Sequence, residues 1–207
     1  MPAVNVCIPV LRRYDLLKRL LASLGPSTVR PEGIFIIDNG RSADRLEAAT
    51  KESSLPIFTH TPVKPMGVAE SWNWFLDNVP EERIISNDDI TFAPDSLEKI
   101  VARPEDLVWA SGFSCFLIRD TCVGKLGRFD ETISPGYAYY EDDDYLQRLD
   151  GRGTKPRQAT AENVDCGVVH ANSATLKAAS HEETLEHHRK FKIAQANYMR
   201  KWGIASL

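Results

Sequence analysis

The first half of the chain alternates apolar runs with amphipathic segments, and this alternation constrains the fold more than any other feature. Four short runs have the length and apolar character of buried strands: 4–10, 33–37, 56–59 and 83–86. Three segments between them have helical spacing of hydrophobic residues or helix-like composition: 16–24, 45–52 and 68–76. Strands that alternate with helices form a parallel sheet. We therefore expect an α/β fold with a mostly parallel central sheet and helices on both faces.

The second half is less regular. Residues 108–118 suit one or two strands, 141–149 have the pattern of an amphipathic helix, and 164–170 read as a strand. A long helix is expected at about 182–202. There is no internal repeat and no linker-like composition, so the expectation is a single domain over 1–207.

Composition argues against several classes of protein. The net charge of −4, from 25 basic and 29 acidic residues, gives no general attraction to polyanions such as nucleic acid. The four cysteines show no C-x-x-C spacing, which favours free thiols in a reducing compartment over structural zinc. There is no signal-peptide pattern and no apolar stretch long enough for a membrane span. We expect a cytoplasmic protein whose membrane contact, if any, is peripheral.

Acidic residues follow two of the expected strands directly. Asp38 comes after 33–37, and Asn87-Asp88-Asp89 comes after 83–86. Ligands of open parallel sheets bind at the carboxyl ends of the strands, so both positions are expected at one edge. Carboxylate and amide oxygens suit Mg²⁺ or Mn²⁺, usually together with substrate phosphates. An ordinary turn that follows a strand is the equally weighted alternative for 87–89.

A second acidic run, at 141–144, opens the helix of 141–149. Helical spacing places Asp142 with the apolar side, leaves Asp143 in solvent, and pairs Asp144 with Arg148 at the surface. A desolvated carboxylate beside other carboxylates has a raised proton affinity, which suits Asp142 for general base catalysis. The alternative is a solvated first turn that complements the helix dipole.

Three further positions are candidates for a binding site. His170 ends an apolar strand and suits a third metal ligand, although a hydrogen-bonded structural histidine is the commoner case. Gly67 precedes a helix that carries Asn73, where backbone amides can approach a ligand. Glu141 is expected to support Asp142.

Taken in order, these segments resemble family-two glycosyltransferases of the GT-A fold. The resemblance extends from about residue 4 to 169. It rests on six segments of the sequence. The first three are the opening strand followed by Arg12 (4–12), the acidic turn (36–42) and the glycine-to-asparagine helix start (67–73). The others are the position of the D-x-D metal motif (85–90), a loop (127–131) and the E-D-x-D helix start that follows it (141–149).

The resemblance implies a GT-A-like, Rossmann-type sandwich that carries out inverting transfer from a nucleoside-diphosphate sugar, with a UDP-sugar favoured. Asp142 would be the general base, assisted by Glu141. A divalent cation, Mn²⁺ or Mg²⁺, would be held by Asp89, Asn87 and His170. Asn87 replaces the usual first Asp, so weaker metal binding is expected. The donor nucleotide would contact Pro9, Val10, Arg12, Asp38, Gly67, Asn73 and Asp88.

Several alternatives stay open. The acceptor hydroxyl could belong to a glycan, a lipid carrier, a protein or a modified base, and the oligomeric state is undetermined. Trp109, Tyr139 and Tyr140 could stack on a sugar or pack in the core. A nucleotidyltransferase-like enzyme is one rival, although 9–13 lacks the glycine-rich phosphate loop that it needs. A non-catalytic module that binds nucleotide-sugars is the other.

Overall fold

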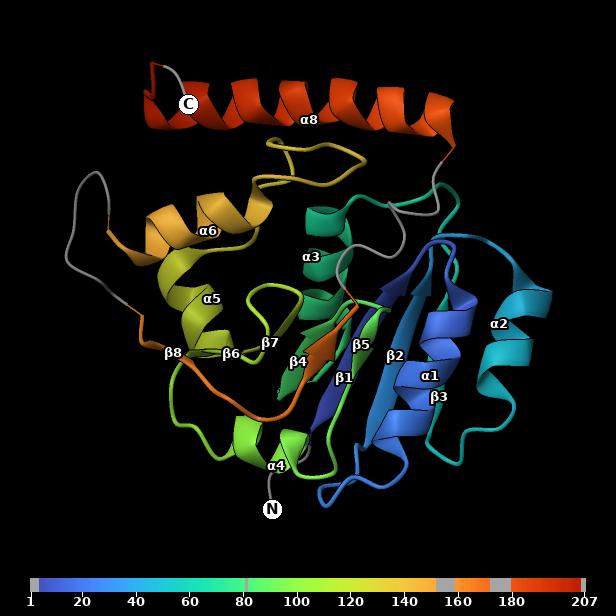
Figure 1. The fold of residues 1–207 in the computed structure, drawn as a ribbon. Coiled ribbons are helices and arrows are strands. Elements are labelled where there is room, and N and C mark those ends of the chain that lie inside the picture. The colour runs from blue at the N-terminus through green and yellow to red at the C-terminus, as the bar shows by residue number, and fades with distance from the viewer. Residues whose placement is uncertain (1–3, 81, 152–158, 172–179, 206–207) are drawn as a thin grey trace.

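The structure is a computed structural model, which describes residues 4–80, 82–151, 159–171 and 180–205. Strands and helices alternate through the first half, as expected (Figure 1). These elements are β1 (Asn5–Val10), α1 (Tyr14–Leu24), β2 (Gly33–Asp38), α2 (Ala43–Thr50), β3 (Ile57–His60), α3 (Val68–Asn78) and β4 (Arg83–Ser86).

The second half contains shorter strands. In order, the elements are β5 (Ile90–Thr91), α4 (Ser96–Val101), β6 (Leu107–Trp109), β7 (Cys115–Ile118), α5 (Asp120–Leu126), α6 (Glu141–Leu149), β8 (Ala161–Asn163), β9 (Val169–His170) and α8 (His181–Trp202). The strand expected at 164–170 is largely absent, because only its last two residues pair.

Seven strands form the main sheet, in the order β3-β2-β1-β4-β7-β6-β8. β1 runs parallel to both β2 and β4, and β2 runs parallel to β3. β7 is antiparallel to β4 and β6, whereas β8 runs parallel to β6. β5 and β9 form a separate antiparallel pair. The parallel strands β1, β2 and β4 therefore end at the same edge of the sheet.

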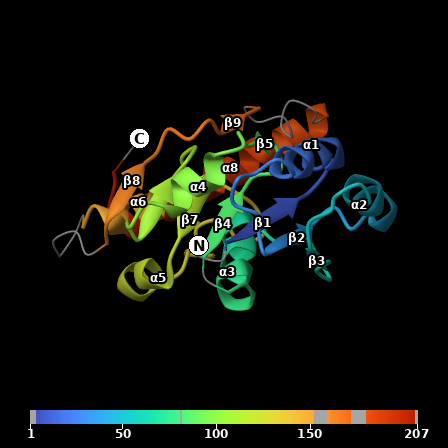
Figure 2. The same ribbon diagram turned by 90° about the horizontal axis from the view of Figure 1, so that it is seen from below.

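Helices cover both faces of this sheet, as Figure 2 shows. Alternate residues of β1 enter two hydrophobic clusters, because successive side chains of a strand point to opposite faces. Ile8 packs in the cluster that contains Leu97 of α4 and four leucines of α1, Leu17, Leu20, Leu21 and Leu24. Cys7 packs in the cluster that contains Trp72 of α3 and Tyr145 of α6.

The helix α8 lies across the carboxyl edge of the parallel strands (Figure 1). It begins with a reciprocal cap, in which Ser180 Oγ accepts from the Glu183 backbone N–H and the Glu183 carboxylate accepts from the Ser180 N–H. It ends at Gly203, whose φ of 63° is the left-handed conformation that favours glycine. In the parts of the chain that the structure describes, no helix has the length and apolar character needed to cross a membrane.

Candidate active site

The acidic turn after β2 is buried and internally hydrogen-bonded. One oxygen of Asp38 accepts from the Tyr14 hydroxyl, and the other accepts from the Ser42 backbone N–H at 3.0 Å. Burial and the Asp38 carboxylate raise the pKa of Tyr14. Asp38 therefore fixes the turn at the sheet edge in addition to any contact with a ligand.

Asn39 was not singled out from the sequence, yet it connects this turn to the approach to α3. Its side-chain oxygen accepts from the Met66 N–H at 2.8 Å, and its amide donates to Ser71 Oγ at 3.3 Å. The Asp-Asn-Gly turn at 38–40 was the available signal. Turn chemistry predicts that such a side chain bonds to the backbone nearby, so the contacts of Asn39 with residues 66 and 71 could not be expected from it.

The turn at 87–89 joins β4 to β5, and it is partly withdrawn from solvent. Asp88 and Asp89 are each 7% exposed, whereas Asn87 is half-buried. The Asn87 N–H donates to the Ser114 carbonyl at 2.8 Å, which ties the turn to the loop before β7. Burial, and then the neighbouring Asp89 charge, raise the pKa of Asp88 to about 7.

His170 lies beside this turn, because β9 pairs with β5 in a register that aligns it with Ile90. Its Nε2 lies 3.0 Å from Asp89 Oδ1. This is the distance of a direct histidine–carboxylate contact, as expected for a hydrogen-bonded structural histidine. It is also roughly the separation of adjacent ligands of an octahedral ion with bonds of about 2.1 Å, so the same oxygen and nitrogen fit one divalent cation. Across the described ranges, no group of three His, Cys, Asp or Glu side chains is arranged to hold a metal. Substrate phosphates would have to complete the coordination.

The orientation of the acidic run differs from the prediction. Asp144 is fully buried and Glu141 is 5% exposed, whereas Asp142 is half-buried. The prediction that Asp142 points inward is therefore wrong, and Asp143 is exposed as expected. The inward face passes through the first and fourth acidic positions and on to Tyr145, in keeping with helical spacing.

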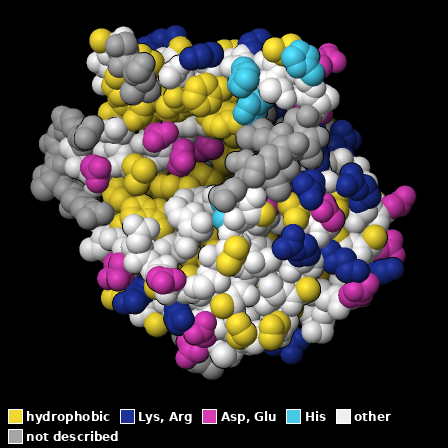
Figure 3. Space-filling view, viewed as in Figure 1, with side chains coloured by type: hydrophobic (Ala, Val, Ile, Leu, Met, Phe, Trp, Pro, Cys, Tyr) yellow, Lys and Arg dark blue, Asp and Glu magenta, His cyan; other side chains and the backbone are white. Residues whose placement is uncertain are grey.

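Glu141 has the environment that the sequence assigned to Asp142. Burial, with the neighbouring Asp142 charge, raises the pKa of Glu141 to about 8, and Ser134 Oγ donates to its carboxyl group at 3.0 Å. Glu141 is therefore mainly protonated at neutral pH. Asp142 stays accessible. Figure 3 shows acidic side chains over α6, at the edge of a hollow that lies below α8 and is surrounded by hydrophobic side chains.

The expected pair of Asp144 and Arg148 is present, but it is not a surface pair. The buried Asp144 accepts from Arg148 Nε at 3.0 Å, from Lys201 Nζ at 2.6 Å and from Trp202 Nε1 at 3.0 Å. Two of these donors belong to the last turn of α8. The carboxylate therefore joins α6 to α8, which spacing within α6 could not reveal.

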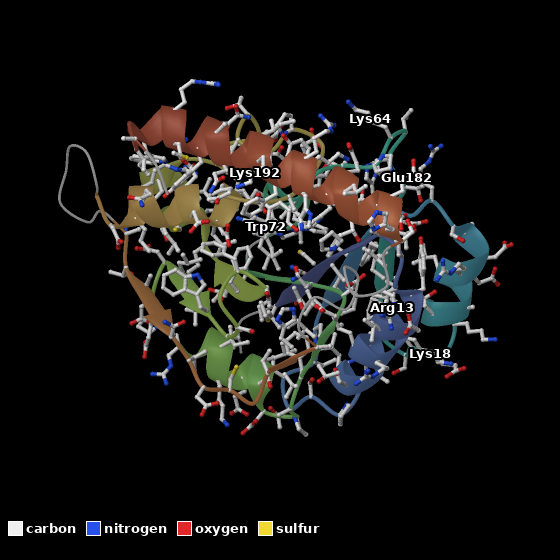
Figure 4. The ribbon with its side chains drawn as sticks, turned by 45° about the horizontal axis from the view of Figure 1, so that its top comes forward. Arg13, Lys18, Lys64, Trp72, Glu182 and Lys192 are labelled. Atoms are coloured by element: carbon white, nitrogen blue, oxygen red, sulfur yellow. The ribbon has the colours of Figure 1, made fainter. Side chains whose placement is uncertain are left out.

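Of the donor-side residues expected in and after β1, Arg12 contacts the beginning of α8. Pro9 is half-buried and Val10 is fully buried, so Val10 offers only its carbonyl, which accepts from the Asn39 N–H at 2.8 Å. Arg12 forms an ion pair of 2.6 Å with Glu183. Figure 4 shows Arg13 and Glu182 at this end of the molecule.

Gly67 and Asn73 serve the loop contacts of α3. A Cβ at Gly67 would lie 2.7 Å from both the N and the O of Tyr137, so glycine permits this close approach. The Asn73 amide donates to the Phe129 carbonyl and to Glu131, and its oxygen accepts from the Phe129 N–H. The donor-binding role expected for Asn73 is not what its contacts show, because all of these bonds fasten the loop at 127–131.

The three candidate stacking residues contact protein aromatics. Tyr139 and Tyr140 pack against α8, and Trp109 lies edge-on to Phe113 with ring centroids 5.9 Å apart. All three side chains are half-buried, and of the three only Trp109 packs against a core cluster. Figure 4 places Trp72 beneath α8, near the centre of the molecule.

Comparison with known proteins identifies the fold. No protein-family model and no curated protein matches the sequence. Solved structures match along nearly the whole chain. The mannosyltransferase PcManGT from Pyrobaculum calidifontis, in complex with GDP-Man and Mn²⁺, has a TM-score of 0.64 at 14% identity, over 100% of this chain and 76% of its own. The chain has the GT-A fold.

Two further GT-A structures agree. Glucosyl-3-phosphoglycerate synthase from Mycobacterium tuberculosis, in complex with Mn²⁺, UDP-glucose and phosphoglyceric acid, has a TM-score of 0.65 at 15% identity, over 99% of this chain and 81% of its own. TarS 1-349 from S. aureus has a TM-score of 0.63 at 14% identity, over 99% and 73%. At such identities the likeness establishes the fold alone, and it confirms the architecture expected from the sequence.

Proposed function

We propose that the protein is a glycosyltransferase that moves a sugar from a nucleoside-diphosphate sugar to an acceptor hydroxyl. The observation that carries this proposal is the pair of Asp89 and His170, 3.0 Å apart at the carboxyl edge of a GT-A sheet. The fold supports it, because ligands of open α/β sheets bind at that edge. Glu141 and Asp142 supply the second group of carboxyls that the reaction needs.

On this proposal Asp89 and His170 hold a Mn²⁺ or Mg²⁺ ion, with Asn87 and Asp88 on the same turn. The bound cation would supply positive charge to the diphosphate leaving group. The PcManGT and mycobacterial structures contain Mn²⁺, with GDP-mannose in one and UDP-glucose in the other. A UDP-sugar remains the donor that we favour.

Asp142 is proposed as the general base. Its side chain is half-buried and can contact an acceptor, whereas Glu141 is 5% exposed and Asp144 is fully buried. Proton transfer to Asp142 would accompany attack by the hydroxyl on the anomeric carbon from the face opposite the diphosphate, which inverts its configuration. The protonated Glu141 leaves Asp142 without a charged neighbour on that side.

The test is a panel of nucleotide-sugars and acceptors with Mn²⁺, scored by released nucleoside diphosphate and by the anomeric configuration of the product. Asp142→Asn should abolish transfer while nucleotide binding, measured by thermal shift, persists. Asp143→Asn is the matched control, since Asp143 is the exposed neighbour on the same turn. Full activity of Asp142→Asn would remove the base assignment.

A non-catalytic module that binds nucleotide-sugars is the second candidate. Asn87 at the first position of the metal motif favours it, because an amide contributes no charge to cation binding. This alternative predicts saturable donor binding with no release of nucleoside diphosphate for any acceptor in the panel.

A further inference from the structure

The two residues before the acidic run have unusual backbone conformations. Tyr139 has φ of 102° and Tyr140 has φ of 65°, and Tyr140 is the cap residue from which α6 begins. Positive φ is uncommon for a residue with a Cβ, and for a bulky one it is an outlier. Such a conformation persists only where the surrounding structure holds it, and it often marks a functional site.

The contacts that hold these tyrosines come from α8. The Tyr139 ring packs edge-on against Phe191 with centroids 5.1 Å apart, and its hydroxyl contacts the His187 ring. Tyr140 lies 5.4 Å from Phe191 and is stacked on Tyr198 at 5.0 Å. Side chains of α8, at the far end of the sequence, therefore contact both Tyr139 and Tyr140.

That helix is itself fixed at both ends. Its first turn is paired through Glu183 with Arg12, at 2.6 Å. Its last turn is bound to α6 through Lys201 and Trp202, which both donate to the buried Asp144. Because α8 is held to the sheet edge and to α6, its aromatic face has a defined position relative to the loop at 139–140.

We propose that α8 positions Asp142 by holding Tyr139 and Tyr140 in the left-handed conformation from which α6 starts. Phe191 and Tyr198 are then positioning residues, which act through the tyrosines without contact to substrate. The inference rests on the proposed function, since Asp142 is its general base. When the contacts of Phe191 and Tyr198 with the tyrosines are lost, the backbone at 139–140 relaxes. The direction of the first turn of α6 then changes.

Substitution of Tyr140 separates backbone conformation from ring contact. Tyr140→Ala and Tyr140→Gly both remove the ring, but glycine adopts positive φ without the steric cost that a Cβ brings. We expect Tyr140→Ala to lower kcat by about tenfold or more, with donor KM little changed, because small displacements of a catalytic group are costly. Tyr140→Gly should recover most of that loss.

A matched pair of substitutions on α8 tests the other side of the contact. Phe191→Ala removes the ring that touches both tyrosines, so kcat should fall as in Tyr140→Ala. Leu185→Ala, on the same helix at a side chain 56% exposed, should leave kcat unchanged. Circular dichroism and thermal unfolding would establish that each variant is folded.

Hydrogen exchange of the amides at 139–144 gives a readout that does not depend on activity. Exchange should be faster than in the wild type for Phe191→Ala and Tyr140→Ala, and slower in Tyr140→Gly than in Tyr140→Ala. Equal kcat and equal exchange for the alanine and glycine variants would overturn the inference, as would an unaffected Phe191→Ala. A wild type that transfers no sugar, yet shows the expected exchange pattern, would contradict the proposed function and leave the positioning by α8 supported.

Discussion

Carboxyl groups of a single helical turn lie in three different environments in this protein. Glu141 is buried with a serine hydroxyl as its donor, Asp143 is exposed, and Asp144 is buried among Arg148, Lys201 and an indole N–H. Burial without a cationic partner favours the neutral form of an acid. The neutral form of Glu141 is accordingly stabilised by the folded protein, with a measurable consequence for stability.

We predict that Glu141→Gln changes the pH dependence of stability. The pKa of Glu141 is raised from 4.5 to about 8 on folding, so its protonated form stabilises the folded state fully below pH 4.5. That contribution is lost as the pH rises to about 8. Glutamine cannot ionise, so the stability of the variant relative to the wild type should rise by up to about 5 kcal/mol between pH 4.5 and pH 8. Thermal midpoints between pH 4 and 9 measure the change, with the exposed Glu182→Gln as control, and a difference independent of pH contradicts it.

A second prediction concerns Gly67. An added Cβ would meet the backbone of Tyr137 at 2.7 Å, and backbone yields less readily than a side chain. Gly67→Ala should lower the free energy of unfolding by about 1–3 kcal/mol. The matched control is Gly124→Ala within α5, where no atom lies near the new Cβ, and this change should stabilise by about 0.5–1 kcal/mol. Denaturant unfolding of both variants provides the comparison, and equal effects would exclude a close approach at Gly67.

At the scale of elements, α6 and α8 are joined by a carboxylate that neither helix could satisfy alone. Removing one partner of a buried ionic group leaves the others unpaired and costs more than the pair itself contributes. Asp144 accepts from one cation of its own helix and from two donors of α8. We therefore expect α6 and α8 to unfold together, because Asp144 links them.

We predict that Asp144→Ala destabilises the protein by about 3 kcal/mol, because it leaves Arg148 without its carboxylate and Lys201 with Asp130 in place of the buried acceptor. Asp143→Ala, one residue earlier and exposed, should change stability by less than about 0.5 kcal/mol. Chemical denaturation measures both values. Hydrogen exchange in α8 should also become faster in Asp144→Ala but not in Asp143→Ala. Unchanged protection of α8 in Asp144→Ala would contradict the link between α6 and α8.

Periodicity predicted the long elements, including the strands of the first half and the C-terminal helix, because each buries one face along its own length. Periodicity could not predict the two-residue strands β5 and β9, since they are defined only by pairing with each other. The prediction of which acidic side chains of α6 are buried was wrong for a related reason. A carboxylate counts as polar in a pattern, yet Asp144 is buried by donors some 58 residues away in sequence.

The candidate site was predictable where its residues follow strands and not where they follow loops. Asp89 was expected at the sheet edge because it follows a strand, and the structure brings His170, the candidate third ligand, to within 3.0 Å of it. The amide of Asn73 bonds to Phe129, and the tyrosines at 139 and 140 pack on α8. Those contacts depend on loop paths that composition and spacing do not specify.

At the scale of the whole molecule, the proposed donor site draws on both ends of the chain. Asp89 comes from the first half, and His170 and α8 come from the second. The net charge of −4, with acidic side chains at the site, opposes binding of a nucleoside diphosphate. A divalent cation would offset that repulsion, so nucleotide and cation should bind cooperatively.

We predict that UDP and Mn²⁺ together raise the unfolding temperature by more than the sum of their separate effects. A ligand at 100 times its Kd stabilises by about 2.7 kcal/mol, which is roughly 5–10 °C for a chain of this size. His170→Ala should remove the excess, because it deletes one ligand of the cation. His188→Ala on the exposed side of α8 is the control and should retain it. Additive shifts in the wild type would contradict a shared site, and an excess that survives in His170→Ala would place the cation elsewhere.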